Sequence, residues 1–356
     1  MKVSRSTRSI LITALGVGLI CSVPTVSMAR VKGVCANCHT MHASQQNDGR
    51  KAFTGTTTTP RTGLLANDCY GCHTDSSASF NLFSSIGAPL VVVTQGPNAT
   101  DTLLPGGFIE INATEETQHS ISAVTGTGLS SPPGWNAGDS SATNSHRDGI
   151  TWTNTTLVCA GTYGCHGDPQ EAGQGAAVSG IHHRATALGY RGLYGISGIE
   201  STNYNVELNI YSGVSTPTNT KNFTISSLCA QCHSDFHDLG DDKDTTTNGG
   251  TDTAWIRHPT DFALSLANQT NDDYTGYSNN AEVPIGKVWS SFNVTVNSGQ
   301  SWPVANRVVI CLSCHRAHGS RNNDLLRWSY ETMVASTTGA GAGKGCFRCH
   351  TTKDGI

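Results

Sequence analysis

Apolar residues in this 356-residue chain come in short runs that are separated by long polar stretches. Two runs, residues 90–94 (LVVVT) and 107–111 (GFIEI), are rich in Val and Ile and lie between Gly and Pro residues, which predicts short strands. Another run, residues 307–310 (RVVI), ends a region of loops and short strands that begins at residue 257. The pattern predicts a mostly irregular fold with low secondary structure, short helices and a few β-hairpins.

The N-terminal segment has a different pattern. Three basic residues precede an apolar run, residues 10–20, and the small-residue sequence SMA follows at residues 27–29. This order is typical of a secretory signal. We therefore expect residues 1–29 to be a signal peptide and residues 30–356 to form a single mature unit. The apolar run is too short to cross a bilayer and nothing later is apolar enough, so we expect no membrane span in the mature chain.

The composition gives little material for a conventional core. Only 37% of the residues are hydrophobic and 7% are aromatic, while Gly, Ser, Thr and Asn are abundant. The charged fraction of 13% is too low for simple charged disorder. The net charge of −4 gives no indication of a nucleic-acid partner.

Six short motifs join two cysteines to a following histidine. The first is CANCH at residues 35–39, and residues 159–166 are a longer version with five residues between the cysteines. The twelve motif cysteines are Cys35, Cys38, Cys69, Cys72, Cys159, Cys165, Cys229, Cys232, Cys311, Cys314, Cys346 and Cys349. The six motif histidines are His39, His73, His166, His233, His315 and His350.

Cys-x-x-Cys-His is the attachment site of a c-type haem, in which both thiols become thioethers and the histidine binds iron from one side. A disulfide scaffold does not explain the histidine after each pair, and a zinc protein would use the pairs two at a time without it. The motifs therefore predict a hexahaem cytochrome c. Six large apolar macrocycles would form the core, and the polypeptide would wrap around a chain of six haems.

The thirteenth cysteine, Cys21, lies within the predicted signal peptide. Cleavage after Ala29 removes it, so that every cysteine of the mature chain has a haem role. The alternative is a lipoprotein signal acylated at Cys21, but Ile20 stands where a small residue is expected.

Eight further histidines could supply the second axial ligand of each iron. His146 lies in the polar run NSHRD and is expected at the surface. The other seven are the distal candidates His42, His119, His182, His183, His237, His258 and His318. Six irons need six distal ligands if all are bis-histidine, so one candidate is surplus, and the sequence does not say which.

Spacing restricts these assignments. His42 and His318 lie three residues after a motif histidine, and His237 lies four after one. On a helix such residues share a face with the motif histidine, whereas the two ligands of one iron approach from opposite sides. These three histidines are therefore expected to bind a neighbouring iron. The adjacent pair at residues 182–183 points to opposite faces if extended and could serve two haems.

All six motifs end in histidine, whereas a catalytic multihaem protein needs an open iron position, often marked by a lysine in the motif. With ample distal ligands, we predict electron transfer with no catalytic residues rather than the alternative, a multihaem reductase.

Two weaker patterns add little. The acidic loop at residues 238–252 could bind calcium but lacks a ligand pattern, so a solvated loop is expected. The first two motifs start 34 residues apart and the last two 35, which hints at a repeated two-haem unit.

Several of these motifs together resemble a known family. They are CANCHTMH at residues 35–42, CAQCHSDFH at 229–237, RHP at 257–259, CLSCHRAHG at 311–319 and the terminal motif at 346–350. In the same order along the chain, they resemble the extracellular cytochrome filament proteins of the OmcS/OmcE type, the cytochrome nanowires. His119 also stands where that family has a histidine ligand. Residues 140–225, with the CX5CH motif, depart from the family pattern.

The resemblance implies a secreted, extracellular filament, exported through the periplasm, in which copies of the chain join head to tail. It implies that His42 binds an iron in the next subunit. Partners would be other redox proteins or extracellular electron acceptors. The alternatives are a monomeric exported shuttle and the cytochrome of an outer-membrane conduit, whereas a structural or adhesive protein would not need six cofactors.

Overall fold

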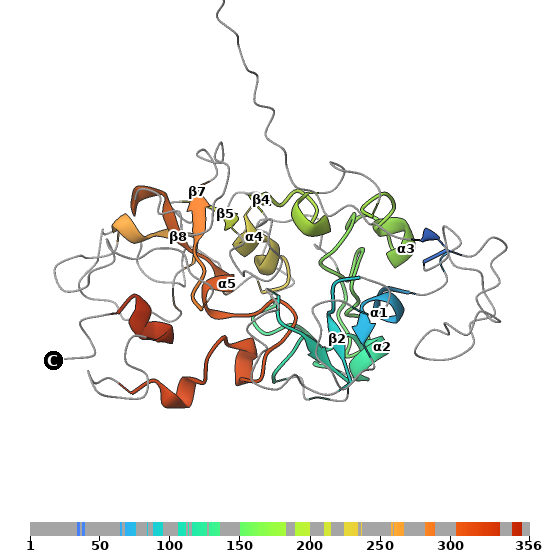
Figure 1. Cartoon of the computed structure of the whole chain (residues 1–356), viewed down its shortest axis with the longest axis horizontal. Helices are drawn as coiled ribbons and strands as arrows, with labels where there is room; N and C mark the ends of the chain where they lie inside the picture. Colours follow the sequence, from blue (N-terminus) through green and yellow to red (C-terminus); the bar gives the residue numbers. More distant parts are fainter. Residues whose placement is uncertain are drawn as a thin grey trace, which may run out of the picture.

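The computed structural model describes residues 34–35, 38–39, 65, 68–75, 84, 88–94, 106–111, 113, 116–126, 128–135, 150–182, 189–199, 210–214, 224–233, 236, 258, 260–266, 282–288, 304–334 and 344–350. In these residues, short helices and two small sheets are joined by irregular segments (Figure 1). The predicted mostly irregular fold is confirmed. The physical reason is that apolar runs of three or four residues support one turn or one short strand and no more.

The first sheet lies near the second haem motif. Its strands are β1 (Thr74–Asp75), β2 (Val92–Val93) and β3 (Ile109–Glu110), and Val92 lies opposite both Thr74 and Ile109. The strands predicted at residues 90–94 and 107–111 are therefore confirmed as β2 and β3. All three strands are parallel, which differs from the hairpins that the pattern favoured. A run rich in Val and Ile indicates that a strand exists, but it does not indicate whether the strand pairs with its partner in parallel or antiparallel.

A small apolar cluster attaches two helices to this sheet. Val92 and Ile109 pack with Tyr70 of α1 (Cys69–Cys72) and with Val124 of α2 (Ser122–Thr125). Each of these side chains is less than one tenth exposed. Burying an apolar side chain of this size contributes about 1.5–3 kcal/mol, so the cluster fixes the helix of the second motif against the sheet.

The second sheet has five strands in the order β4-β5-β7-β8-β6. They are β4 (Gly198–Ile199), β5 (Ile210–Gly213), β7 (Gly286–Val288), β8 (Arg307–Val309) and β6 (Phe262–Ala263). Three of its pairings are antiparallel, and β5 with β7 is parallel. The strand predicted at residues 307–310 is confirmed as β8.

The main core lies between this sheet and two helices that carry haem motifs. Helix α4 (Ile225–Ala230) contributes Ile225 and Leu228, and β8 with the start of α5 (Cys311–Cys314) contributes Val308 and Ile310. Ile310 is fully buried and joins β8 directly to α5. Figure 1 shows α4 and α5 beside the strands β5, β7 and β8. The core therefore holds the fourth and fifth motifs together.

The remaining described helices are single turns. They are α3 (Gln174–Ala177), η4 (Tyr190–Gly192), η7 (Leu264–Leu266), η9 (Val304–Asn306), η10 (Asn323–Leu325), η11 (Tyr330–Thr332) and η12 (Gly345–Arg348). None of the helices in the described part of the chain has both the length and the apolar character needed to cross a bilayer.

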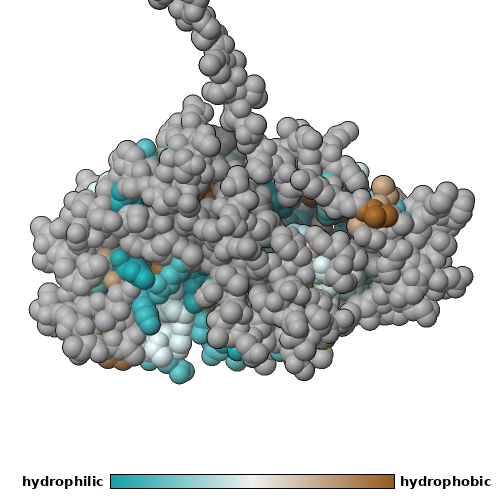
Figure 2. Space-filling model, in the orientation of Figure 1, coloured by the Kyte–Doolittle hydropathy of each residue, from teal (hydrophilic) through white to brown (hydrophobic). Residues whose placement is uncertain are grey.

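The coloured surface in Figure 2 is mainly hydrophilic or intermediate, with hydrophobic atoms in small separate groups. The predicted signal peptide at residues 1–29 and the acidic loop at residues 238–252 lie outside the described residues.

Candidate haem sites

The six cysteine–histidine motifs close in the same way. In each, the backbone N–H of the histidine donates to the carbonyl of the first cysteine. The donor–acceptor distances are 2.9 Å for His39 and His73, and 3.0 Å for His166, His233, His315 and His350. One closed turn presents both thiols and the following imidazole as a unit, which is the arrangement that covalent haem attachment requires.

Local polar side chains begin several of these turns. Asp68 caps α1 by accepting from the N–H of Gly71 at 3.0 Å, and Thr224 caps α4 by accepting from Ser227 at 3.0 Å. An N-cap of this kind contributes about 1 kcal/mol. The caps explain why sequences as short as CYGC form a helical turn at all.

The longer motif at residues 159–166 closes like the others despite its three extra residues. The N–H groups of Cys165 and His166 both donate to the carbonyl of Cys159, at 3.2 and 3.0 Å. The extra residues form a loop in which Gly161 donates to the carbonyl of His166 at 2.9 Å. A side chain at Gly164 would meet the backbone nitrogen of Ala160 at 2.3 Å, so only glycine fits there. The loop thus restores the CXXCH geometry.

We expect intact mass to show six covalent haems on the mature chain, because all six motifs are closed. Gly164→Ala is expected to open the loop at residues 159–166 and to leave the third haem without one thioether or absent. The matched control is Gly173→Ala, since a side chain at Gly173 meets nothing within 4 Å. A mass that corresponds to five haems on the unmodified chain would show that the third motif does not carry a covalent haem.

Four motif histidines each face a second histidine ring. The centroid distances are 6.4 Å for His73 and His182, 6.1 Å for His119 and His233, 6.2 Å for His166 and His318, and 6.1 Å for His258 and His350. A metal–imidazole bond is about 2 Å long and the ring centroid lies about 1 Å beyond the ligand nitrogen, so rings on opposite sides of one metal have centroids about 6 Å apart. The spacing of all four pairs fits an iron between the two rings.

Backbone carbonyls orient most of these rings. The Nδ1 atom lies within hydrogen-bond distance of a carbonyl oxygen in six histidines. The partners are Pro89 for His73 (2.7 Å), Ala317 for His119 (2.7 Å), Arg191 for His166 (3.1 Å), Pro133 for His233 (2.8 Å), Asp324 for His315 (2.6 Å) and Gly107 for His318 (3.4 Å). A carbonyl can only accept, so Nδ1 carries the proton and the lone pair of Nε2 is available to a metal.

Burial keeps the same imidazoles neutral. It lowers the pKa of His73, His119, His166 and His315, and lowers the pKa of His233 to about 4 and of His318 to about 3. Repulsion from the neighbouring histidine of the same pair adds to the effect in His233 and His318. Neutral imidazole is the form that binds iron, so the protonation state and the orientation agree.

Consecutive motifs lie beside each other. The interacting side chains are Cys38 with Cys72, Cys69 with Cys159, Cys165 with Cys229, Cys229 with Cys311, and Cys314 with Cys346 and Cys349. Burial is the main reason why the pKa of the Cys72 thiol and that of the Cys314 thiol rise to about 12. Each motif therefore has a cysteine near a cysteine of the next motif along the sequence, from the first to the sixth.

Polar side chains fix two of these junctions. The amide oxygen of Gln174 accepts from the N–H of Cys159 at 3.1 Å and lies 4.0 Å from the thiol of Cys69. The hydroxyl of Ser226 accepts from the N–H of Cys311 at 3.3 Å. These residues were not identified from the sequence, since isolated Gln and Ser residues carry no pattern.

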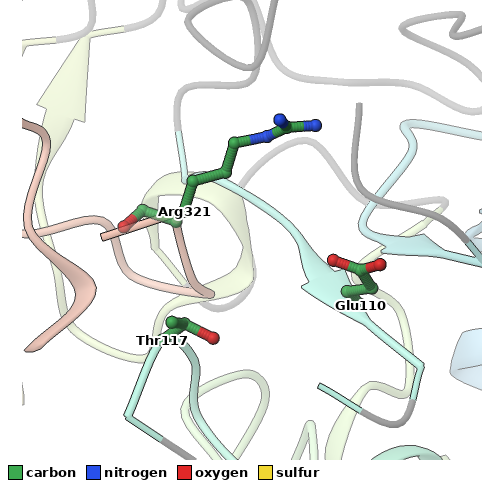
Figure 3. Close-up of a pocket in the computed structure, with 4 residues that line it drawn as sticks. Glu110, Thr117 and Arg321 are labelled. Atoms are coloured by element: carbon green, nitrogen blue, oxygen red, sulfur yellow. The ribbon is translucent and has the colours of Figure 1, made fainter. Parts of the chain in front are cut away.

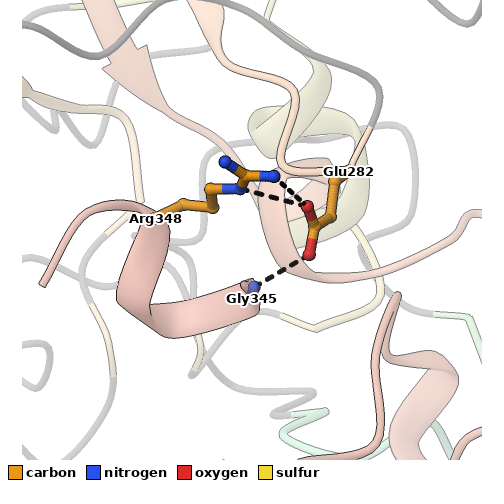
Figure 4. Close-up of polar contacts among 3 residues, drawn as sticks. All are labelled: Glu282, Gly345 and Arg348. Atoms are coloured by element: carbon orange, nitrogen blue, oxygen red, sulfur yellow. Dashed lines mark hydrogen bonds and ion pairs between the residues drawn. The ribbon is translucent and has the colours of Figure 1, made fainter. Parts of the chain in front are cut away.

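The sixth motif is held by an ion pair (Figure 4). Glu282 accepts from Nη2 of Arg348 at 2.8 Å and from its Nε at 3.0 Å, and also accepts from the N–H of Gly345 at 3.1 Å. Arg348 lies between the two cysteines of this motif. The pair therefore orients η12.

Glu282→Gln is expected to lower the free energy of unfolding by less than about 1 kcal/mol, because the Arg348 and Glu282 side chains are 42% and 31% exposed and water screens the pair. Denaturant unfolding at low and high salt measures this, and the difference should shrink at high salt. Glu331→Gln, a change at an exposed residue on η11, is the control. A loss of several kcal/mol would show that the pair does more than orient the turn.

Three of the predicted distal candidates, His42, His183 and His237, lie outside the described residues, as does His146. The other four, His119, His182, His258 and His318, each face a motif histidine. His318 faces His166 and not His315, three residues before it, which agrees with the expected outcome, although the segment from His315 to His318 is not helical as the spacing argument assumed.

A comparison with protein families agrees with the motif chemistry. The family described as the doubled CXXCH motif matches residues 302–355, which include the fifth and sixth motifs. A solved structure, the Outer Membrane Cytochrome S Filament from Geobacter sulfurreducens, is 18% identical over 86% of each chain, with a TM-score of 0.41. The comparison with curated proteins finds no match. The chain thus carries paired motifs for covalent c-type haem.

Proposed function

We propose that this protein transfers electrons through a row of six covalently attached haems, each held between two histidines. The observation that carries the proposal is the set of four facing histidine pairs, with ring centroids 6.1–6.4 Å apart. Each pair joins one motif histidine to a histidine outside the motifs. When bound, each haem supplies a centre that exchanges one electron.

The protein's own groups tune and protect these centres. In the four described pairs, the two imidazoles would hold an iron from both sides, which would leave no place for a substrate and favours electron transfer over reduction chemistry. Carbonyl acceptors on Nδ1 make the imidazoles more electron-rich, which would favour the oxidised iron and lower its potential. The thiols of each motif fix the edge of the macrocycle against the polypeptide.

The contacts between consecutive motifs support a row in sequence order. Neighbouring motifs share side-chain interactions from Cys38 and Cys72 at one end to Cys314 and Cys346 at the other. Sites this close allow electrons to pass from each centre to the next. The row therefore has two ends, near the first and sixth motifs.

Two irons, those of His39 and His315, would draw distal ligands from His42, His183 and His237. His42 follows His39 by three residues, the same spacing as between His315 and His318, and His318 faces His166 rather than His315, so by analogy its own haem is taken to be excluded. We propose that His42 binds an iron in a second copy of the chain. Donor and acceptor surfaces then differ, and head-to-tail contacts of this kind produce open filaments unless the rotation closes. An exported, extracellular filament is the form we propose.

We expect every iron of the oxidised protein to be low-spin. Among the four described pairs, the pair at the sixth motif should give the most distinct signal in electron paramagnetic resonance, because the rings of His258 and His350 cross at 81°, compared with 32–51° in the other three. The relative orientation of axial ring planes sets the splitting of the iron orbitals. A high-spin iron in the resting protein would instead indicate an open site and a reductase.

A further inference from the structure

Two of the distal histidines lie on one narrow ribbon of chain. Residues 117–119 and 317–320 form an antiparallel pair in which Gln118 lies opposite Gly319. The N–H of His119 donates to the carbonyl of His318 at 2.9 Å, and that of Ser320 donates to Thr117 at 2.9 Å. We call these two segments the ligand ribbon.

Strand geometry puts both ligands on the same face of the ligand ribbon. Residues directly opposite each other in an antiparallel pair point to the same side, with Cβ atoms about 5 Å apart. His119 lies opposite His318, one step from the bridge between Gln118 and Gly319. His119 faces His233 and His318 faces His166, so adjacent ligands on one ribbon serve the fourth and third haems.

Hydrogen bonds link the two ligands further. Nδ1 of His119 donates to the carbonyl of Ala317, the residue before His318, at 2.7 Å. Nδ1 of His318 lies 3.4 Å from the carbonyl of Gly107, and its N–H donates to Gly106 at 2.7 Å. The strand that carries one ligand thus orients the ring of the other.

Gln118 fastens the other face of the ligand ribbon to β3. Its side chain is only 3% exposed, and its amide pairs with both backbone groups of Glu110, accepting from the N–H at 2.6 Å and donating to the carbonyl at 2.8 Å. The amide therefore replaces a strand neighbour. Gln118 is adjacent to His119 in the ribbon, and its side chain reaches across to β3 of the adjacent sheet.

The ribbon is also tightly packed at Gly319. A side chain at Gly319 would meet the carbonyl oxygen of Phe108 at 2.4 Å and Cβ of Gln118 at 2.6 Å. A polar hollow of about 440 Å³ lies beside the ribbon. Figure 3 shows three residues that line it: Glu110 from β3, Thr117 from one ribbon strand, and Arg321, which follows the other. A shift of one strand therefore moves the other.

We propose that Gln118 is a positioning residue that sets the axial geometry of two irons at once, those of the third and fourth haems. The proposal rests on the proposed function, because it takes His119 and His318 as iron ligands. Gln118 touches neither iron. It acts by holding the ligand ribbon, and with it both His119 and His318, against β3, so that its loss loosens the hydrogen bond from Nδ1 of His318 to Gly107 and lets the His119 ring move with the ribbon.

The test uses the haem-loaded protein with Gln118→Met, which keeps the length of the side chain and removes both hydrogen bonds to Glu110. We expect this variant to carry six haems, all low-spin. In a spectroscopic redox titration, two of the six one-electron steps should move to more positive potential, while the other four should coincide with those of the unmodified protein. Gln170→Met, at an exposed position, should leave all six unchanged. Gln118→Leu also removes both hydrogen bonds to Glu110 without adding a charge and is the alternative if Gln118→Met does not accumulate; it should shift the same two electrons.

A shift confined to one electron, spread over all six, or absent in both variants would overturn the proposal. Two further variants separate this failure from failure of the proposed function. His119→Ala and His318→Ala should each produce one high-spin iron. If neither histidine variant produces a high-spin iron, the assignment of His119 and His318 as ligands is wrong. If both variants do, and the Gln118 variants shift no pair of potentials, only the positioning role of Gln118 is wrong.

Discussion

Replacing His318 by alanine is expected to convert one iron to high spin and to raise its potential strongly, since axial ligand identity moves haem potentials over a range of about 0.8 V. The affected iron should be that of the third motif, although His318 follows the fifth motif. The reason is that its ring lies 6.2 Å from that of His166, with both rings oriented by backbone carbonyls.

Double variants identify the iron. His166→Ala combined with His318→Ala removes both ligands of one haem, so one low-spin haem is lost. His315→Ala combined with His318→Ala affects two haems. Spin counting by electron paramagnetic resonance distinguishes the two results. The account would be contradicted if the variant with His315→Ala lost one low-spin haem and the variant with His166→Ala lost two. His318 would then bind the iron of the fifth haem.

The second large effect concerns assembly. His42→Ala is expected to yield a secreted monomer with six covalent haems that no longer polymerises, and one iron per subunit should lose its usual ligand. In the proposed interface, a coordination bond fixes the register between subunits, and its loss removes that constraint. Electron micrographs of the secreted material and a spin count measure the two parts of this expectation.

His146→Ala is the matched control for assembly, because His146 is the histidine we expect at the surface. It should form filaments like the unmodified chain. Filaments of the His42→Ala protein with six low-spin irons would show that His42 does not act between subunits.

The motifs could be predicted as haem attachment sites from the sequence because they are local. The spacing from Cys69 to His73 fixes one hydrogen bond, and the same bond recurs in every motif. The strands at β2, β3 and β8 were also predicted, since runs of Val and Ile in short segments favour extended backbone. The irregular fold followed from the scarcity of such runs.

Which histidine faces which could not be predicted, because the pairing depends on tertiary contacts. His119 and His318 come together through the ligand ribbon, whose key side chain, Gln118, binds backbone atoms of Glu110. Backbone acceptors such as the carbonyl of Ala317 carry no residue signature. The ion pair of Glu282 with Arg348 joins positions 66 residues apart and has no local pattern either.

A structure of the haem-loaded, secreted protein at a resolution that shows the iron ligands tests the account most directly. We predict six low-spin irons in a row that follows the order of the motifs, with four of them between His73 and His182, His166 and His318, His233 and His119, and His350 and His258. An iron with water in one axial position, or a row in which consecutive motifs do not hold neighbouring haems, would contradict it.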